Sequence, residues 1–239
     1  MGDDGSWSDA SVSETVRHLV GVALSHDEAA PGRCVVDRAR TIPEFRDLLF
    51  DGGLAARICR DWGEAWTANR MSFVGVTVAS ARLQAALRQL PRPTDPDGGT
   101  GCLLMVVPAW EGHQLAAALA ADALRGRGAD VRLVAGPATP EEASAMVEGG
   151  RFDGLMVSVG TDGAWDRSLA FAADLRDRLD RTIPLIAGGP AAGGRVDMPR
   201  AGGADLVTND LDDAIAICNL PLASPAGPAG RGAETRPEP

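Results

Sequence analysis

The stretch Cys102-Leu103-Leu104-Met105-Val106-Val107-Pro108 decides how this chain folds. It is a short apolar run that ends at a proline, and the turn after it carries Glu111-Gly112-His113. Such a run is typical of a buried strand in a parallel sheet, and a helical pattern begins at His113. Residues in a turn between a buried strand and a helix lie at the carboxyl edge of the sheet, where open α/β sheets bind ligands.

The second half of the chain repeats this alternation of strand and helix. Strands are predicted at 103–107, 131–134, 154–157, 184–187 and 205–207. Helices are predicted at 113–125, 140–148, 165–179 and 210–218, with a short turn near Met198. Five strands that alternate with helices predict an α/β fold class, with a doubly wound parallel sheet of the Rossmann or flavodoxin-like kind.

The first half of the chain has helical period instead. Apolar positions recur on one face in four segments and predict a small helix bundle, at 12–23, from Phe45, at 54–66 and at 73–87. Pro31-Gly32 and the arginines that follow predict a solvated loop. Residues 91–100 are rich in proline and glycine and predict a linker. The predicted domains are therefore a bundle at 1–90, an α/β domain at 101–220 and a disordered tail at 221–239.

Composition limits the classes of function. The chain has 239 residues, of which 45% are hydrophobic and 23% are charged, as in a soluble globular protein. No run approaches about eighteen apolar residues, and the N-terminus is acidic, so we expect a cytoplasmic protein without a membrane span or secretory signal. All 23 basic residues are arginine and the net charge is −10, which argues against autonomous DNA binding. The four cysteines lack metal-site spacing and are interpreted as core residues.

The first loop at the predicted carboxyl edge holds the most informative residues. A neutral imidazole at His113 is a natural axial ligand for a metal cofactor. Glu111, two residues earlier, is placed to accept the other ring N–H and so to fix the tautomer of the ligand. By itself, Glu-x-His is more often an ordinary helix start with a nearby acid. The residues of two other loops at the same edge favour the ligand-binding interpretation.

Two further loops carry hydrogen-bonding or glycine residues. The third strand leads into Ser158 and Thr161, whose hydroxyls donate or accept hydrogen bonds. The fourth strand leads into Gly188-Gly189, which let a bulky group lie against the backbone. Taken singly, each loop is more often structural. Together the three loops predict a slot that runs down into the sheet.

These residues resemble the cobalamin-binding fold shared by methionine synthase, corrinoid proteins and cobalamin mutases. The pattern of that fold is Asp-x-His-x-x-Gly, then Ser-x-Leu or Ser-x-Thr, then Gly-Gly. The resemblance implies that His113 is the lower axial ligand of cobalt and that Gly112 belongs to the same motif. It also implies that Ser158 and Gly188-Gly189 lie along the buried dimethylbenzimidazole tail, with Thr161 nearby.

The chain departs from that pattern at three positions. Glu111 replaces the aspartate, Ala116 replaces the last glycine of the histidine motif, and Gly160 stands where leucine or threonine is usual. Glutamate at this position resembles the photoreceptor branch of the family. The methyl group of Ala116 is added where the tail must pass.

Residues of the predicted bundle indicate which branch of this family the chain resembles. Trp66 is followed after nine residues by Val76-Thr77. Light-sensing repressors of the CarH kind carry Glu-His at that spacing, whereas Val-Thr resembles the AerR/PpaA group of antirepressors that act on the CrtJ/PpsR photosynthesis-gene repressor. The resemblance spans roughly residues 40 to 218 and implies that Trp66, Val76 and Thr77 cap the upper corrin face. The helical spacing of Trp66 with Trp62 is equally consistent with bundle core.

The resemblance implies a light-responsive transcriptional antirepressor without enzymatic activity, with a CrtJ/PpsR-type repressor as its partner and no direct binding of DNA or membrane. Because Val and Thr do not coordinate cobalt as histidine does, aquo- or hydroxocobalamin is the expected cofactor form. The alternatives are a corrinoid carrier of a methyltransferase system and a heme-binding redox sensor. His18 and His26 are interpreted as structural, although either reaches the open cobalt face if the N-terminal segment folds over the cofactor.

Overall fold

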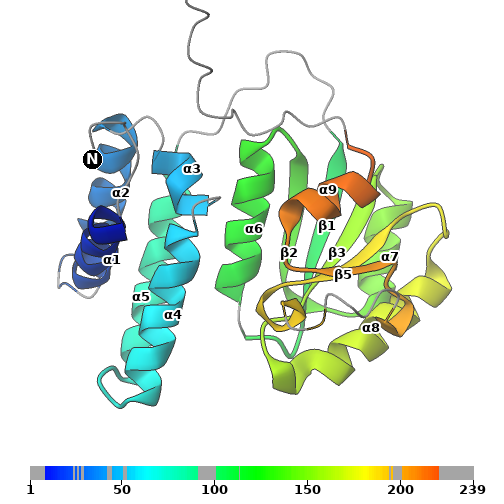
Figure 1. Cartoon of the computed structure of the whole chain (residues 1–239). Helices are drawn as coiled ribbons and strands as arrows, with labels where there is room; N and C mark the ends of the chain where they lie inside the picture. The colour runs from blue at the N-terminus through cyan, green and yellow to red at the C-terminus, as the bar shows by residue number, and fades with distance from the viewer. Residues whose placement is uncertain are drawn as a thin grey trace, which may run out of the picture.

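The computed structural model describes residues 9–23, 25, 27, 30–41, 45–50, 53–90, 101–112, 114–193, 195 and 201–220. A helix bundle stands beside a sheet that is covered on both faces by helices, and helix α6 stands between the two (Figure 1). The predicted linker at 91–100, the turn near Met198, the tail at 221–239, His26 and His113 lie outside the described residues.

The bundle contains α1 (Asp9–Ala23), α2 (Ala30–Thr41), α3 (Phe45–Phe50), α4 (Leu54–Thr67) and α5 (Phe73–Leu87). Its buried core comes from the apolar faces that the sequence predicts. The largest fully buried side chains there are Phe45, Leu49, Leu54, Ile58 and Trp62.

The predicted loop at Pro31-Gly32 is wrong, because both residues lie in the first turn of α2. Proline is tolerated there, since the first N–H groups of a helix have no partner within the helix. A Cβ on Gly32 would lie 2.5 Å from the Gln89 side chain, so glycine at this position allows a close approach. Pro31 therefore belongs to a helix start and Gly32 to a packing contact, although both indicated a loop.

The sheet contains β1 (Cys102–Pro108), β2 (Asp130–Ala138), β3 (Gly154–Ser158), β4 (Leu185–Gly188) and β5 (Leu206–Thr208). The strand order is β2-β1-β3-β4-β5, and each neighbouring pair is parallel. This confirms the predicted α/β fold class. Because β1 connects to β2 on one side and the chain then returns to β3 on the other, the switch point of the topology lies between β1 and β3.

Helices α6 (Gln114–Gly126), α7 (Pro140–Glu148), α8 (Trp165–Arg178) and α9 (Leu211–Ile217) cover the sheet. Side chains of β1 alternate between two buried clusters, as the two-residue period of a strand requires. Leu103, Met105 and Val107 pack with α6 and α9, whereas Leu104 and Val106 pack with α7 and α8. Burial on both faces explains why the run at 102–108 is apolar throughout.

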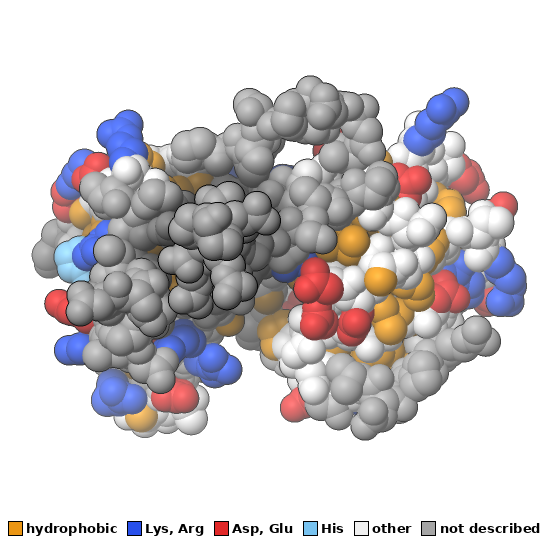
Figure 2. All heavy atoms as spheres, turned by 45° about the horizontal axis from the view of Figure 1, so that its top comes forward, with side chains coloured by type: hydrophobic (Ala, Val, Ile, Leu, Met, Phe, Trp, Pro, Cys, Tyr) orange, Lys and Arg blue, Asp and Glu red, His pale blue; other side chains and the backbone are white. Residues whose placement is uncertain are grey.

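Charged side chains of both signs are interspersed on the face of the molecule in Figure 2. Among the coloured residues of that view, arginine side chains do not form a continuous stripe. Within the described part of the chain, no helix combines the length and the apolarity needed to cross a bilayer.

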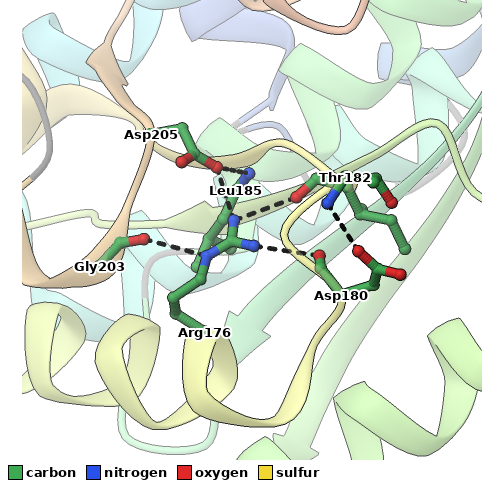
Figure 3. A network of polar contacts seen from close by, with 7 residues as sticks. Arg176, Asp180, Thr182, Leu185, Gly203 and Asp205 are labelled. Carbon is green, nitrogen blue, oxygen red and sulfur yellow. Dashed lines mark hydrogen bonds and ion pairs between the residues drawn. The ribbon is translucent and has the colours of Figure 1, made fainter.

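A buried arginine joins α8 to the strands beside it (Figure 3). Arg176 forms an ion pair of 2.6 Å with Asp205, just before β5, and the same carboxylate oxygen accepts the N–H of Leu185 at 2.8 Å. The guanidinium also donates to the carbonyl oxygens of Asp180, Ile183 and Gly203. The charge is therefore compensated, and the guanidinium donates to the carbonyl oxygens of Ile183 and Gly203, whereas that of Asp180 also accepts the N–H of Ile183.

Replacing Arg176 with Met should destabilise the fold by about 2–3 kcal/mol, because the carbonyl groups and Asp205 lose their shared donor. The measurement is the free energy of unfolding in urea. Arg178→Met, on the same helix, is the matched control, since its ion pairs with Glu141 and Asp174 are exposed and should contribute less. Equal losses in the two variants would contradict the prediction.

Candidate functional site

Glu111 is a buried carboxylate at the switch point of the sheet. Its side chain is part of a residue that is only 4% exposed, and Oε2 accepts the N–H of Gly160 at 2.9 Å. Its own N–H donates to the carbonyl of Pro108. Glu111 therefore ties the loop after β1 to the loop after β3. The predicted contact between Glu111 and the imidazole of His113 stays a prediction, since His113 is outside the described residues.

Trp110, immediately before Glu111, was missed by the sequence analysis. Its ring contacts Phe171 of α8 edge-on, with centroids 5.5 Å apart, and the guanidinium carbon of Arg167 lies 4.3 Å from the ring centroid. A tryptophan two residues after a buried strand and directly before Glu-x-His is the signal that was available. Gly112, by contrast, is exposed, and a Cβ there would meet no atom within 4 Å.

Ser158 and Gly188 are brought together as the sequence predicts. They are register partners at the carboxyl ends of β3 and β4. Met156 and Ile186, two residues earlier in each strand, face α6 and α9, so Ser158 and Gly188 lie on that same face. Thr161 is partly buried and precedes a short 3-10 helix, η1 (Asp162–Ala164).

Gly189 has a backbone conformation and a close backbone contact that favour glycine. Its φ is 121°, in a region that favours glycine, and a Cβ would lie 2.8 Å from the carbonyl oxygen of Val159. Gly188 is also crowded, since a Cβ there would lie 3.1 Å from the carbonyl oxygen of Thr208. The glycine pair therefore lets the ends of β3, β4 and β5 approach each other, and only Gly188 lies on the face predicted for the ligand tail.

Trp66 is not a core residue of the bundle. It is 50% exposed, whereas Trp62, one turn earlier, is fully buried. The ring of Trp66 lies 6.2 Å from that of Phe73, which is 68% exposed. We call these two residues, together with the exposed Val74 and Val78, the apolar tip.

Val76 and Thr77 do not share one environment. Val76 is partly buried against the bundle core, whereas Thr77 is exposed and its hydroxyl donates to the carbonyl of Phe73 at 2.9 Å. Successive residues of a helix differ by about 100° in direction, which separates the two side chains. Of the predicted capping residues, Trp66 and Thr77 are thus exposed, while Val76 contributes to the core.

The apolar tip lies beyond the start of α6. Helices α5 and α6 run side by side in the same direction (Figure 1), and Gln84 of α5 and Ala118 of α6 line one cavity of about 220 Å³. Phe73 is eleven residues before Gln84, or roughly 16 Å, whereas Gln114 is four residues before Ala118, or roughly 6 Å. The bundle therefore extends roughly 10 Å past the start of α6, at the end of the sheet where the loop after β1 emerges.

The described residues hold no cluster of three or more side chains that could bind a bare metal ion. A corrin ring supplies four nitrogen ligands to its cobalt, so a corrinoid needs one protein nitrogen rather than a cluster. Burial raises the pKa of the Cys59 and Cys218 thiols to about 11. Both thiols therefore remain protonated at neutral pH, and Cys218 is a small side chain of the core that α6 and α9 share with the sheet, whereas Cys59 is partly exposed.

Comparison with known proteins places this chain beside a sequence relative and beside solved structures. No protein-family model matches the chain. A 20.5 kDa protein in the bchF-crtJ intergenic region of Rhodobacter capsulatus is 32% identical over 192 residues, which cover 73% of this chain and 99% of that protein. The structure of the Methanosarcina barkeri monomethylamine corrinoid protein matches with a TM-score of 0.65 at 14% identity, covering 87% of this chain and 98% of that one. The second likeness shows that the bundle-and-sheet fold is shared.

Replacing Gly189 with Ala should destabilise the protein by about 2 kcal/mol or more, because alanine disfavours this φ and its methyl group meets the Val159 carbonyl. The measurement is thermal unfolding. Gly112→Ala is the matched control, since open space surrounds that position, and a change within about 0.5 kcal/mol is expected. Similar melting temperatures for the two variants would show that Gly189 is not required by the backbone.

Proposed function

The chain belongs to the family of the Rhodobacter capsulatus 20.5 kDa protein, and from this premise we propose that it is a cobalamin-binding, light-responsive antirepressor of the AerR/PpaA type. It acts through a CrtJ/PpsR-type repressor of photosynthesis genes. The observation that carries this proposal is the buried Glu111 at the switch point, two residues before His113, whose carboxylate ties the loop after β1 to the loop after β3. The bchF-crtJ location of the relative supports a photosynthesis-gene context.

The residues at the carboxyl edge fit a corrinoid. His113 would be the lower ligand of cobalt, and Glu111 would hold the imidazole through its other ring nitrogen. Ser158 and Gly188, adjacent on the α6 and α9 face, would line the tail. When bound, the cofactor supplies a cobalt whose bond to an alkyl upper ligand is broken by light. The likeness to a corrinoid protein supports this assignment at the level of the fold.

The apolar tip would cover the upper face of the cofactor. An exposed tryptophan stacks well on a flat ring, and Trp66 is already in contact with Phe73. Neither Val76 nor Thr77 coordinates cobalt as a histidine does, and Val76 packs into the bundle. A bulky adenosyl group would compete with Trp66 for space, so the aquo or hydroxo form of cobalamin should be favoured.

The regulatory part of the proposal rests on the division into bundle and sheet. A cofactor that binds one arrangement of the two more tightly than another converts its own binding into a change of exposed surface. A differential affinity of about 100-fold, or ~2.7 kcal/mol, is sufficient for such a switch. The protein would bind a repressor rather than DNA, and it would carry no enzymatic turnover of its own.

Purified protein should bind hydroxocobalamin more tightly than adenosylcobalamin in darkness, because a bulky upper ligand would compete with Trp66 for space. His113→Ala should abolish corrinoid retention, and Glu111→Gln should weaken binding on the order of 10-fold. Absorption spectra after gel filtration measure retention. His18→Ala is the control, since the exposed His18 lies on α1.

Retention of cobalamin by His113→Ala equal to that of the wild type would contradict the assignment of the ligand. A heme spectrum in place of a corrinoid spectrum would favour the heme-sensor alternative. Methyl transfer from a bound methylcorrinoid in the presence of a methyltransferase would favour the carrier alternative.

In gel-shift experiments on photosynthesis-gene promoters, this protein alone should not retard the DNA, because its charge is −10 and its arginines are interspersed with acids. With a CrtJ/PpsR-type repressor present, the hydroxocobalamin-loaded protein should change the repressor's shift, and the apoprotein should not. A repressor response that is indifferent to cobalamin would refute the regulatory proposal.

A further inference from the structure

We propose that Trp110 is a positioning residue: Arg167 and Phe171 of α8 hold it and with it the loop after β1, and coordination of cobalt by the proposed ligand His113 depends on these contacts. This inference rests on the proposed function, since it assigns a purpose to contacts around the cobalt ligand. It concerns a residue that the cobalamin-binding sequence pattern does not include.

Trp110 is held from two directions by the same helix. Phe171 meets its ring at an interplanar angle of 78°, which is the edge-to-face geometry that aromatic pairs prefer. The guanidinium of Arg167, one turn earlier in α8, lies over the ring at 4.3 Å, within the range of a cation–π interaction. The indole ring is therefore held by contacts at its edge and at its face.

Glu111 adds a second anchor from the same part of the chain. Its carboxylate accepts the N–H of Gly160, two residues after the end of β3 and shortly before α8. The loop after β1 is thus attached at two successive residues to the segment that runs from β3 into α8. Only Gly112 and His113 separate the second anchor from the start of α6 at Gln114.

The indole of Trp110 also carries an unpaired polar group. Within the described part of the chain, its Nε1–H is buried and has no hydrogen-bond partner. An unpaired buried donor carries a free-energy cost, which phenylalanine would avoid at similar shape. Tryptophan nevertheless offers the best face for a guanidinium. Trp62 in the bundle core has the same unpaired donor, so the feature of Trp110 that supports a positioning role is its contact with Arg167 and Phe171.

The experiment uses the full chain loaded with cob(II)alamin, with histidine labelled by ¹⁵N. In electron paramagnetic resonance, a ¹⁵N axial ligand splits each cobalt line into two, whereas a ¹⁴N ligand from the cofactor's own base splits it into three. The two-line pattern thus reports coordination by a protein histidine. Cobalamin affinity from absorption titration is the second readout.

Trp110→Leu should replace most of the two-line pattern with three lines and lower the affinity at least fivefold. Arg167→Met should have the same effect, more weakly, because it removes the charge and keeps most of the side-chain length. Trp110→Phe should keep the two-line pattern in most molecules, since an aromatic face remains. Arg178→Met, at the other end of α8, is the matched control and should behave as the wild type.

If the wild type binds cobalamin with two-line splitting and Trp110→Leu and Arg167→Met keep both pattern and affinity, the positioning role is wrong while the proposed function stands. If the wild type binds no cobalamin, both the proposed function and this inference are wrong. Should Trp110→Leu fail to fold, Arg167→Met decides, because it alters only an exposed guanidinium.

Discussion

The hydrogen bond from the Gly160 amide to the buried Glu111 carboxylate is the contact on which the candidate site depends. A carboxylate with so little exposure needs donors around it, because desolvation of an unpaired charge is costly. The topology provides one, since β1 and β3 are neighbours and their following loops emerge together at the switch point. The position of the histidine motif is therefore a consequence of strand order.

Helix α6 belongs to both halves of the molecule. Its residues Ala117, Ala121 and Leu124 pack on the sheet, while Leu115 and Leu119 pack against the bundle core. Its first residue directly follows His113. A shift of the loop at that end therefore acts on an element that the bundle also contacts, which is a physical route for coupling. The cavity between α5 and α6 leaves space for small displacements along this contact.

Much of the fold could be predicted because most of its elements have a clear hydrophobic period. The run at 102–108 has no polar interruption and predicts a buried strand. The other four strands and the helices between them are predicted from similar patterns in their own segments. Helix α2 could not be predicted from Pro31-Gly32, because a helix start and a loop use the same residues. The roles of the site residues were harder to predict from the sequence. Both the crowding at Gly189 and the anchoring of Trp110 depend on residues far apart in the chain, which no local pattern reveals. Val76 was assigned by spacing to the upper face of the cofactor, and the structure adds that it is partly buried against the bundle core.

The exposed apolar tip has a consequence for how long the protein persists in a cell. Trp66, Phe73, Val74 and Val78 form an exposed apolar surface at the end of a helical hairpin. Surfaces of this kind promote self-association and recognition by chaperones and proteases when nothing covers them. A chain whose tip is covered only by its ligand is then subject to quality control according to ligand supply. The amount of protein in the cell, and not only its activity, would follow the availability of that ligand.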